Sequence, residues 1–160
     1  MKLRVICTFI LLLSMPSLGL AAGSSSSSDS GRETYSAPEK QPELKAARLA
    51  IARKDYSLAI YELNTVLSKK PEHADAWNLL GYSSRKSGDF ETAETAYKKA
   101  LEIDPKHTQA MEYMGEMYLT LNQPAKAEEL LARLNKLCSF NCVDRDLLKV
   151  AIKKYKAAQS

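Results

Sequence analysis

A period of 34 residues runs through this sequence from about residue 40 to about residue 141. Pro71 and Pro105 are separated by one period, and so are Gly81 and Gly115. Three further rows share the spacing: Ala59, Ala93 and Ala127; Tyr56, Phe90 and Pro124; and Leu63, Tyr97 and Leu131. A period of roughly 20 to 50 residues is typical of stacked repeats, in which each unit contacts only its neighbours. The spacing therefore predicts a solenoid or array.

Each unit has the apolar pattern of two helices joined by a short turn. In the middle unit the first stripe ends at Gly88, which can adopt the positive φ that closes a helix. The second stripe ends before Pro105, because the residue that precedes a proline disfavours helix. Gly81 and Ala93 have almost no side chain, so the paired helices can approach closely, and we expect Trp77 to be largely buried between the first two units. The stripes comprise Ala76, Trp77, Leu80, Gly81 and Ser84, and then Phe90, Ala93, Ala96, Tyr97, Ala100 and Leu101.

These residues make the middle unit resemble the tetratricopeptide repeat family, whose motif reads W-x2-L-G-x2-Y…A-x3-F…P. The matching positions are Trp77, Leu80, Gly81, Ala93, Tyr97 and Pro105. The third unit keeps Met114, Gly115, Tyr118, Ala127 and Leu131, and the first keeps Ala59, Leu63 and Pro71. The match fails at Ser84, where the motif prefers tyrosine. The resemblance implies an all-α fold: a right-handed α-solenoid of three helix-turn-helix units (40–73, 74–107 and 108–141) with a C-terminal capping helix.

Residues 142–160 are expected to form that capping helix, because a stack of repeats has an apolar end that must be covered. Asp144 is a residue type that starts helices, and the lysines near the end suit the helix dipole. The predicted buried stripe is Leu147, Leu148, Ala151, Ile152 and Tyr155. The alternative is a basic amphipathic helix that binds membrane surfaces, which is less favoured because residues 144–158 contain neither Trp nor Phe.

Residues 1–21 have the three-part layout of a secretory signal peptide. Lys2 and Arg4 form a positive start, residues 5–13 are an apolar run, and small residues precede a cut placed after Ala21. Cuts one or two residues later are alternatives. An uncleaved membrane anchor is a further alternative, but the apolar run is well short of the ~20 residues that span a bilayer. The sequence therefore predicts a secreted or periplasmic protein that does not insert into the membrane after cleavage.

Residues 22–39 form a serine-rich leader, which we expect to be disordered because it lacks the apolar side chains that offset ordering entropy. The whole chain is 45% hydrophobic and 26% charged, which excludes a fully disordered or collagen-like chain and a polytopic membrane protein. Two of its 23 basic residues leave with the signal, so the formal net charge falls from +4 to +2. That balance does not indicate a nucleic-acid partner.

The sequence contains no motif for catalysis, phosphate binding or zinc binding. We therefore expect no enzyme activity, no cofactor and no metal site. His73 and His107 are one period apart, which is too far for them to share a metal, and both are expected to be exposed. Cys138 and Cys142 are too few for a zinc site and lack the C-x-x-C spacing of redox and haem motifs. A structural disulfide is favoured over redox or metal use, and the pair resembles the cysteine-pair tail of some secreted bacterial repeat proteins.

The family resemblance implies that the first helix of each unit lines a concave groove that binds a peptide or partner segment. The predicted groove residues are Arg48, Asn78, Tyr82, Arg85, Glu112 and Glu116. Tyr82 and Arg85 are expected to be dispensable for packing. The sequence thus predicts a non-catalytic protein-protein interaction module or scaffold in an extracytoplasmic complex. The alternative is a redox-active or catalytic accessory subunit that uses Cys138 and Cys142.

Overall fold

The computed structural model describes residues 40–159, and the predicted signal (1–21) and leader (22–39) lie outside these residues. The described residues form helices joined by short turns and include no strand. In chain order the elements are the 3-10 helix η1 (Pro42–Leu44) and the helices α1 (Lys45–Ala52), α2 (Tyr56–Lys69), α3 (Ala74–Ser87), α4 (Phe90–Ile103), α5 (Thr108–Thr120), α6 (Pro124–Leu137) and α7 (Val143–Ala158). None of these helices has the length and apolar character that a membrane span requires.

The turn inside each repeat contains one residue in the left-handed backbone region. Lys54, Gly88 and Asn122 have φ values of 61°, 93° and 57°, and they are spaced by 34 residues. The chain then turns into the second helix of the pair, where Asp55 and Asp89 cap α2 and α4. Each aspartate accepts a 3.0 Å hydrogen bond from the backbone N–H three residues later. The same turn is therefore built three times, with glycine only in the middle copy.

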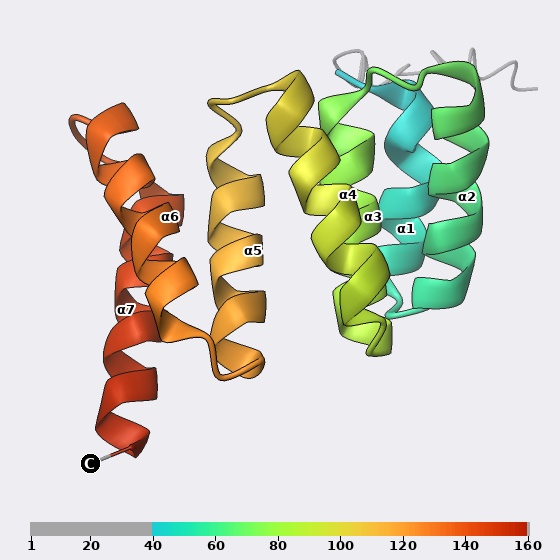
Figure 1. Ribbon diagram of the computed structural model, residues 1–160. Coiled ribbons are helices and arrows are strands. Elements are labelled where there is room, and N and C mark those ends of the chain that lie inside the picture. The colour runs from blue at the N-terminus through green and yellow to red at the C-terminus, as the bar shows by residue number, and fades with distance from the viewer. Residues whose placement is uncertain (1–39, 160) are drawn as a thin grey trace, which may run out of the picture. The chain divides into compact units, whose positions relative to one another are not determined.

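The helices form three antiparallel pairs, α1/α2, α3/α4 and α5/α6, which stack in chain order (Figure 1). α2 packs against α3, α4 packs against α5, and α7 packs against both α5 and α6. This stack is the α-solenoid that the period predicts, and α7 occupies its C-terminal end.

Two core clusters share the α3/α4 pair. The first cluster joins α1, α2 and α3 to Ala96 of α4, and the second joins Ala93 and Tyr97 of α4 to α5, α6 and α7. Trp77 packs against both clusters. Its exposure is intermediate, and its indole N–H donates to the carbonyl oxygen of Pro71 at 2.7 Å.

The prediction that His73 and His107 are exposed is wrong. Their side chains are only 14% and 9% exposed. Each ring turns back to a carboxylate near the start of its own unit: His73 Nε2 lies 3.4 Å from Glu43, and His107 Nε2 lies 3.2 Å from Asp75. Because His73 and His107 are also the N-cap residues of α3 and α5, each connects its own unit to the first helix of the next one.

The buried face of α7 also differs from the predicted stripe. Leu148 and Ile152 are buried, but Leu147 is 50% exposed. Consecutive helical residues point about 100° apart, and the side of α7 that packs on α5 and α6 carries Leu148 and Ile152. Leu147 therefore lies on the outer side of α7.

Candidate functional site

Side chains of α3 and α5 form a compact aromatic and charged group on the face built from the first helices, which we call the groove cluster: Tyr82, Arg85, Tyr113 and Glu116. The rings of Tyr82 and Tyr113 have centroids 5.0 Å apart. The Arg85 guanidinium carbon lies 5.6 Å from the Tyr82 ring and 5.7 Å from the Tyr113 ring. Both distances are within the range of cation–π attraction. The cluster therefore joins two consecutive repeats at the middle of this face.

Arg85 is held more firmly than the sequence predicts. Its Nη1 lies 3.0 Å from Glu116 Oε2, and its side chain is only 10% exposed. Removing a buried guanidinium would leave the Glu116 carboxylate without its countercharge, which destabilises a folded protein. The expectation that Arg85 is dispensable for packing therefore conflicts with its burial. Tyr82 is half-buried and remains open to contact on one side.

Glu112 lies beneath the groove cluster and is only 2% exposed. Burial, together with the neighbouring Glu116 carboxylate, raises the pKa of the carboxyl group to about 8, while Arg85 opposes both. Its Oε2 makes no hydrogen bond within the described part of the chain. α7 packs on α5 and brings Asp144 close enough to add to the same effect. A carboxyl group that keeps its proton near neutral pH fits these surroundings.

A hollow of about 410 Å³ continues the groove cluster toward α7. Arg85 and Glu116 form one side, and Ala151, Lys154 and Tyr155 of α7 form the other. Leu119 and Thr120 of α5 complete the lining. Pockets that combine apolar walls with a few convergent polar groups are typical binding sites. The candidate site therefore extends from α3 across α5 to α7.

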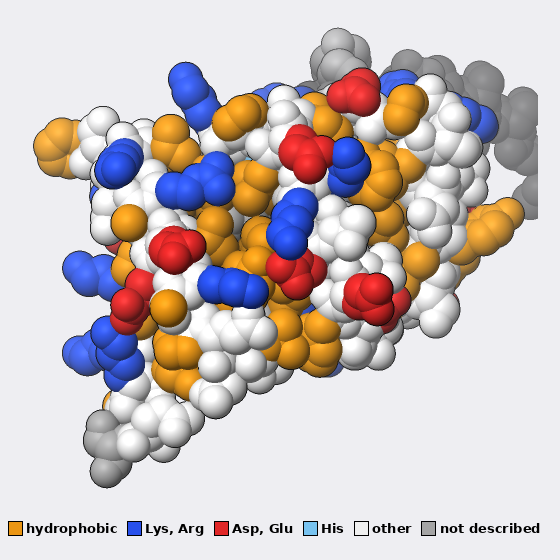
Figure 2. Space-filling view, in the orientation of Figure 1, with side chains coloured by type: hydrophobic (Ala, Val, Ile, Leu, Met, Phe, Trp, Pro, Cys, Tyr) orange, Lys and Arg blue, Asp and Glu red, His pale blue; other side chains and the backbone are white. Residues whose placement is uncertain are grey.

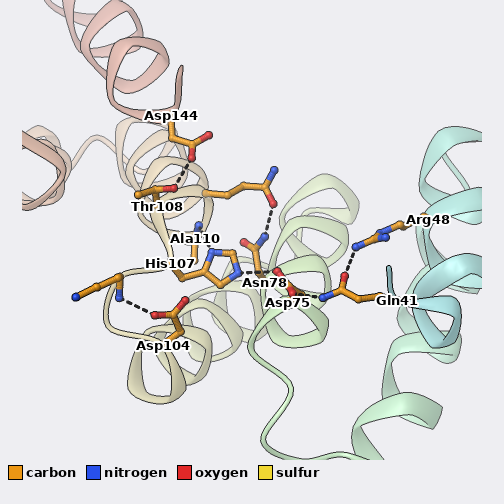
Figure 3. Close-up of polar contacts among 11 residues, drawn as sticks. Gln41, Arg48, Asp75, Asn78, Asp104, His107, Thr108, Ala110 and Asp144 are labelled. Carbon is orange, nitrogen blue, oxygen red and sulfur yellow. Dashed lines mark hydrogen bonds and ion pairs between the residues drawn. The ribbon is translucent and has the colours of Figure 1, made fainter. Parts of the chain in front are cut away.

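Hydrogen bonds connect successive repeats along the edge where the first helices begin (Figure 3). From the N-terminal end, the contacts are Arg48 to Gln41, Gln41 to Asp75, His107 to Asp75, Asn78 to Gln109 and Thr108 to Asp144. The contacts at His107 also fix its ring, because its Nδ1 accepts a 3.2 Å hydrogen bond from the Ala110 N–H. Nε2 then carries the proton that is donated to Asp75. This ladder holds neighbouring first helices at a fixed register.

The six predicted groove residues divide into two groups. Arg48 is exposed, and Tyr82, Arg85 and Glu116 are partly exposed. Asn78 and Glu112 are 1% and 2% exposed, so a partner on the surface does not reach them. The two residues are one period apart: Asn78 lies beneath the contact with α5, and Glu112 lies beneath the contact with α7.

Several contributors to this surface are absent from the predicted set, among them Tyr113, Ala151 and Lys154. Tyr113 occupies the position of Leu79 in the preceding unit, so the period alone gave no sign that it would meet Tyr82. Ala151 and Lys154 belong to α7, which the sequence predicts only as a cap. The spacing does contain a signal for the α7 residues. Leu80, Met114 and Leu148 are 34 residues apart, which indicates that α7 occupies the place of a further first helix.

A second hollow, of about 470 Å³, lies on the other face between α4 and α6. Leu101, Met114 and Leu130 line its floor, and acidic and basic side chains surround it (Figure 2). Some of these charges already pair with their neighbours: Lys98 lies 2.8 Å from Glu94. The first-helix face carries the aromatic pair Tyr82 and Tyr113 beside its ion pair, and the candidate site is placed there.

The two cysteines lie in the turn between α6 and α7, with Cα atoms 5.7 Å apart. A disulfide can span this separation, so the structure brings the pair together, and the disulfide itself stays a prediction. Within residues 40–159 no group of three His, Cys, Asp or Glu side chains is arranged to hold a metal ion.

Stacked helix pairs with a polar and aromatic first-helix face define an α-solenoid repeat protein. Two sequence models of the tetratricopeptide repeat family match the chain, over residues 44–107 and 84–137. Together they cover more than half of the sequence. The chain belongs to the tetratricopeptide repeat family.

Two of the similar proteins match this chain over a small part of their own length. Superkiller complex protein 3 of Mus musculus is 31% identical over 111 residues, which is 69% of this chain and 7% of the relative. Tetratricopeptide repeat protein 37 of Xenopus laevis is 33% identical over 87 residues, which is 54% of this chain and 6% of the relative. The chain thus spans less than a tenth of the length of these relatives. An uncharacterized protein, ycf37 of Porphyra purpurea, is 27% identical over 104 residues, with 59% and 60% coverage.

Solved structures with the same fold include the Sgt2 tetratricopeptide repeat domain of Aspergillus fumigatus. Its TM-score is 0.64 at 22% identity, covering 76% of this chain and 82% of that one. MamA of Desulfovibrio magneticus RS-1 has a TM-score of 0.57 at 24% identity, covering 59% and 54%. At these identities the likeness shows the fold alone. Tetratricopeptide repeat proteins are typically non-enzymatic scaffolds for protein interaction, which supports a non-catalytic binding module.

Proposed function

We propose that the chain is a scaffold subunit of an extracytoplasmic complex and that it binds a peptide or extended partner segment in a concave groove on the first-helix face. One observation carries this proposal. The groove cluster and the hollow beside it form a continuous surface across α3, α5 and α7. Tyrosine and arginine are the residue types that most often dominate binding energy at interfaces.

The charges on this surface indicate the chemistry of the partner. Lys86 lies 5.5 Å from the Tyr82 ring, and Lys154 borders the hollow, whereas Glu116 contributes a carboxylate. A partner segment with both charges and an aromatic or aliphatic residue suits these groups. Tyr82 offers the ring face, and the lysines offer the surrounding cations.

The experiment selects peptides from a displayed library with the wild-type chain and then measures their affinity for variants. Tyr82→Ala should weaken binding by more than tenfold, which is about 1.4 kcal/mol. Tyr61→Ala is the matched control, because Tyr61 is an exposed tyrosine on the second helix α2. Equal loss in both variants, or in neither, would place the binding surface elsewhere.

The extracytoplasmic location rests on residues 1–21, and export is tested separately. The full sequence is expressed in a bacterium and the mature N-terminus is determined by mass spectrometry. We expect a periplasmic or secreted product that begins at residue 22. A cytoplasmic product that retains Met1 contradicts export without affecting the binding proposal.

The alternative is a redox-active or accessory catalytic subunit that uses Cys138 and Cys142. Titration of free thiols separates the two functions. A pair that stays oxidised in mild reductant supports a structural disulfide and the scaffold. A pair that cycles readily with a thiol donor supports the alternative.

A further inference from the structure

The largest group of exposed apolar side chains lies at the C-terminal end, away from the α1/α2 pair. Eight large hydrophobic residues are exposed within residues 40–159, and five of them fall between residues 137 and 150. They are Leu137, Phe140, Val143, Leu147 and Val150. Single exposed apolar residues are common on soluble proteins, but a contiguous group marks an interaction surface.

Three of these residues form a stripe along α7. Val143, Leu147 and Val150 follow one another at intervals of four and three residues, so they share one side of the helix. They are 68%, 50% and 53% exposed. The buried side of α7, with Leu148 and Ile152, faces α5 and α6. The α7 stripe is therefore a second apolar side of the same helix, and no described helix covers it.

The charges beside the α7 stripe point to its occupant. Asp146 and Lys153 lie along the same edge of the α7 stripe, two helical turns apart. Asp146 precedes the midpoint between Leu147 and Val150, and Lys153 follows it. Asp146 also binds Arg145 at 2.9 Å, but its side chain is 59% exposed and its second oxygen can accept another donor. Lys153 is exposed.

A second copy of this helix matches that arrangement. When two identical helices pack antiparallel about a two-fold axis, equal edges meet and the sequence of each runs opposite to the other. If the two-fold axis passes between Leu147 and Val150, Asp146 of each copy lies within about one helical turn of Lys153 of the other copy. The symmetry therefore produces two such pairs. The apolar stripes cover each other between these two ion pairs.

We propose that the chain forms a two-fold dimer through antiparallel packing of the α7 stripe. A single helix pair buries less than the roughly 800 Å² per partner of standard interfaces. The dimer is therefore weak and forms in proportion to concentration. The α7 stripe adjoins the hollow, because Lys154 lies four residues after Val150 on α7. The dimer and the proposed peptide binding are therefore tested by separate variants.

Sedimentation of the purified chain across a roughly hundredfold concentration range tests the dimer. The wild-type chain should shift from monomer to dimer as its concentration rises. Leu147→Asp should weaken the association by more than tenfold. The matched control is Leu49→Asp, because Leu49 on α1 is 49% exposed and lies outside the stripe. Circular dichroism confirms that both variants remain helical.

Charge exchange tests the antiparallel register itself. Asp146→Lys and Lys153→Asp should each abolish self-association, because each variant dimer would bring like charges together. An equal mixture of the two variants should dimerise again, since the opposite charges then face each other in both pairs. The double variant Asp146→Lys/Lys153→Asp should also dimerise as the wild type does.

Three results overturn the proposal. A wild-type chain that stays monomeric throughout the range excludes the dimer, and equal weakening by Leu49→Asp shows that the stripe is not the interface. A mixture of the two charge variants that stays monomeric excludes the antiparallel register. Binding of a monomeric wild type to vesicles that contain anionic lipid, lost in Leu147→Asp, would assign the stripe to a membrane surface instead.

Discussion

A β-carbon placed on Gly115 would lie 2.5 Å from Cδ1 of Leu148. Real side chains do not come this close, so the absence of a side chain at residue 115 is what lets α7 rest directly on α5. In the preceding repeat the equivalent Gly81 makes room for Tyr97, where a β-carbon would lie 2.6 Å from the ring. The same small position thus serves contact with α4 in one repeat and with α7 in the next.

Gly115→Ala should therefore destabilise the fold by about 1–3 kcal/mol, as overpacking of a core does. The free energy of unfolding is measured by urea denaturation. Leu148→Ala alone should cost about 2–5 kcal/mol, because it leaves a cavity in a buried site. The double variant should lose less unfolding free energy than the sum of the two single losses, because alanine at residue 148 leaves room for the methyl group at residue 115. Strict additivity would show that the two residues do not contact.

Glu112 should make stability depend on pH. Its pKa is about 8 in the folded chain against an ordinary value of 4.5, so the folded state retains a proton that the unfolded state releases. The stabilisation from this carboxyl group is complete below pH 4.5 and is lost as the pH rises toward 8. Glu112→Gln does not titrate, so its free energy of unfolding should exceed that of the wild type by more than about 1 kcal/mol at pH 8.

The control for that prediction is Glu72→Gln, because Glu72 lies exposed in the turn between α2 and α3. Its curve of stability against pH should run parallel to that of the wild type. A wild-type curve that rises between pH 5 and pH 8 while the Glu112→Gln curve stays flat would reverse the sign and exclude a buried, protonated Glu112.

His107 and His73 occupy equivalent positions but should differ in their effect on stability. His107 accepts the Ala110 N–H at the start of α5, whereas His73 makes no such side-chain bond at the start of α3. His107→Ala should cost about 0.5–2 kcal/mol, the usual loss for a helix cap. His73→Ala should cost less, as measured by thermal unfolding at pH 7. Equal costs would mean that contact with the carboxylate, rather than the cap, decides stability.

The repeat period predicts the helices because it repeats the physical causes of helix ends. Gly88 and Pro105 mark where one helix must stop, and the rows of small residues mark where helices approach. The period does not predict in the same way which side chains of the groove face are buried. Asn78 and Glu112 carry polar side chains at groove positions, yet α5 covers Asn78 and α7 covers Glu112. That cover depends on how closely the neighbouring helices approach.

The position of α7 was the least predictable part of the candidate site. Its sequence contains two apolar sides, one with Leu148 and one with Val150, and helical periodicity does not state which side faces the core. The close approach at Gly115 decides it. Once α7 lies on α5, Lys154 reaches the hollow beside Arg85, a consequence of packing that no local pattern reveals.

Cys138→Ser/Cys142→Ser should have a small effect. The loop that the pair would close is so short that chain entropy accounts for only ~2 kcal/mol. We expect at most this loss in urea denaturation under oxidising conditions, and unchanged affinity for a selected peptide. The redox alternative would be favoured if the wild type is active in a thiol-exchange assay and the variant, though equally stable, is inactive.

Trp77 is the sole tryptophan of the chain, and it packs against both core clusters. Its fluorescence therefore reports on the seam between the two halves of the stack, whereas circular dichroism reports on every helix. A stack with only nearest-neighbour contacts can lose one end before the other. If the halves separate first, the tryptophan signal changes at a lower urea concentration than the helical signal; coincident midpoints mean that the repeats unfold as one cooperative unit.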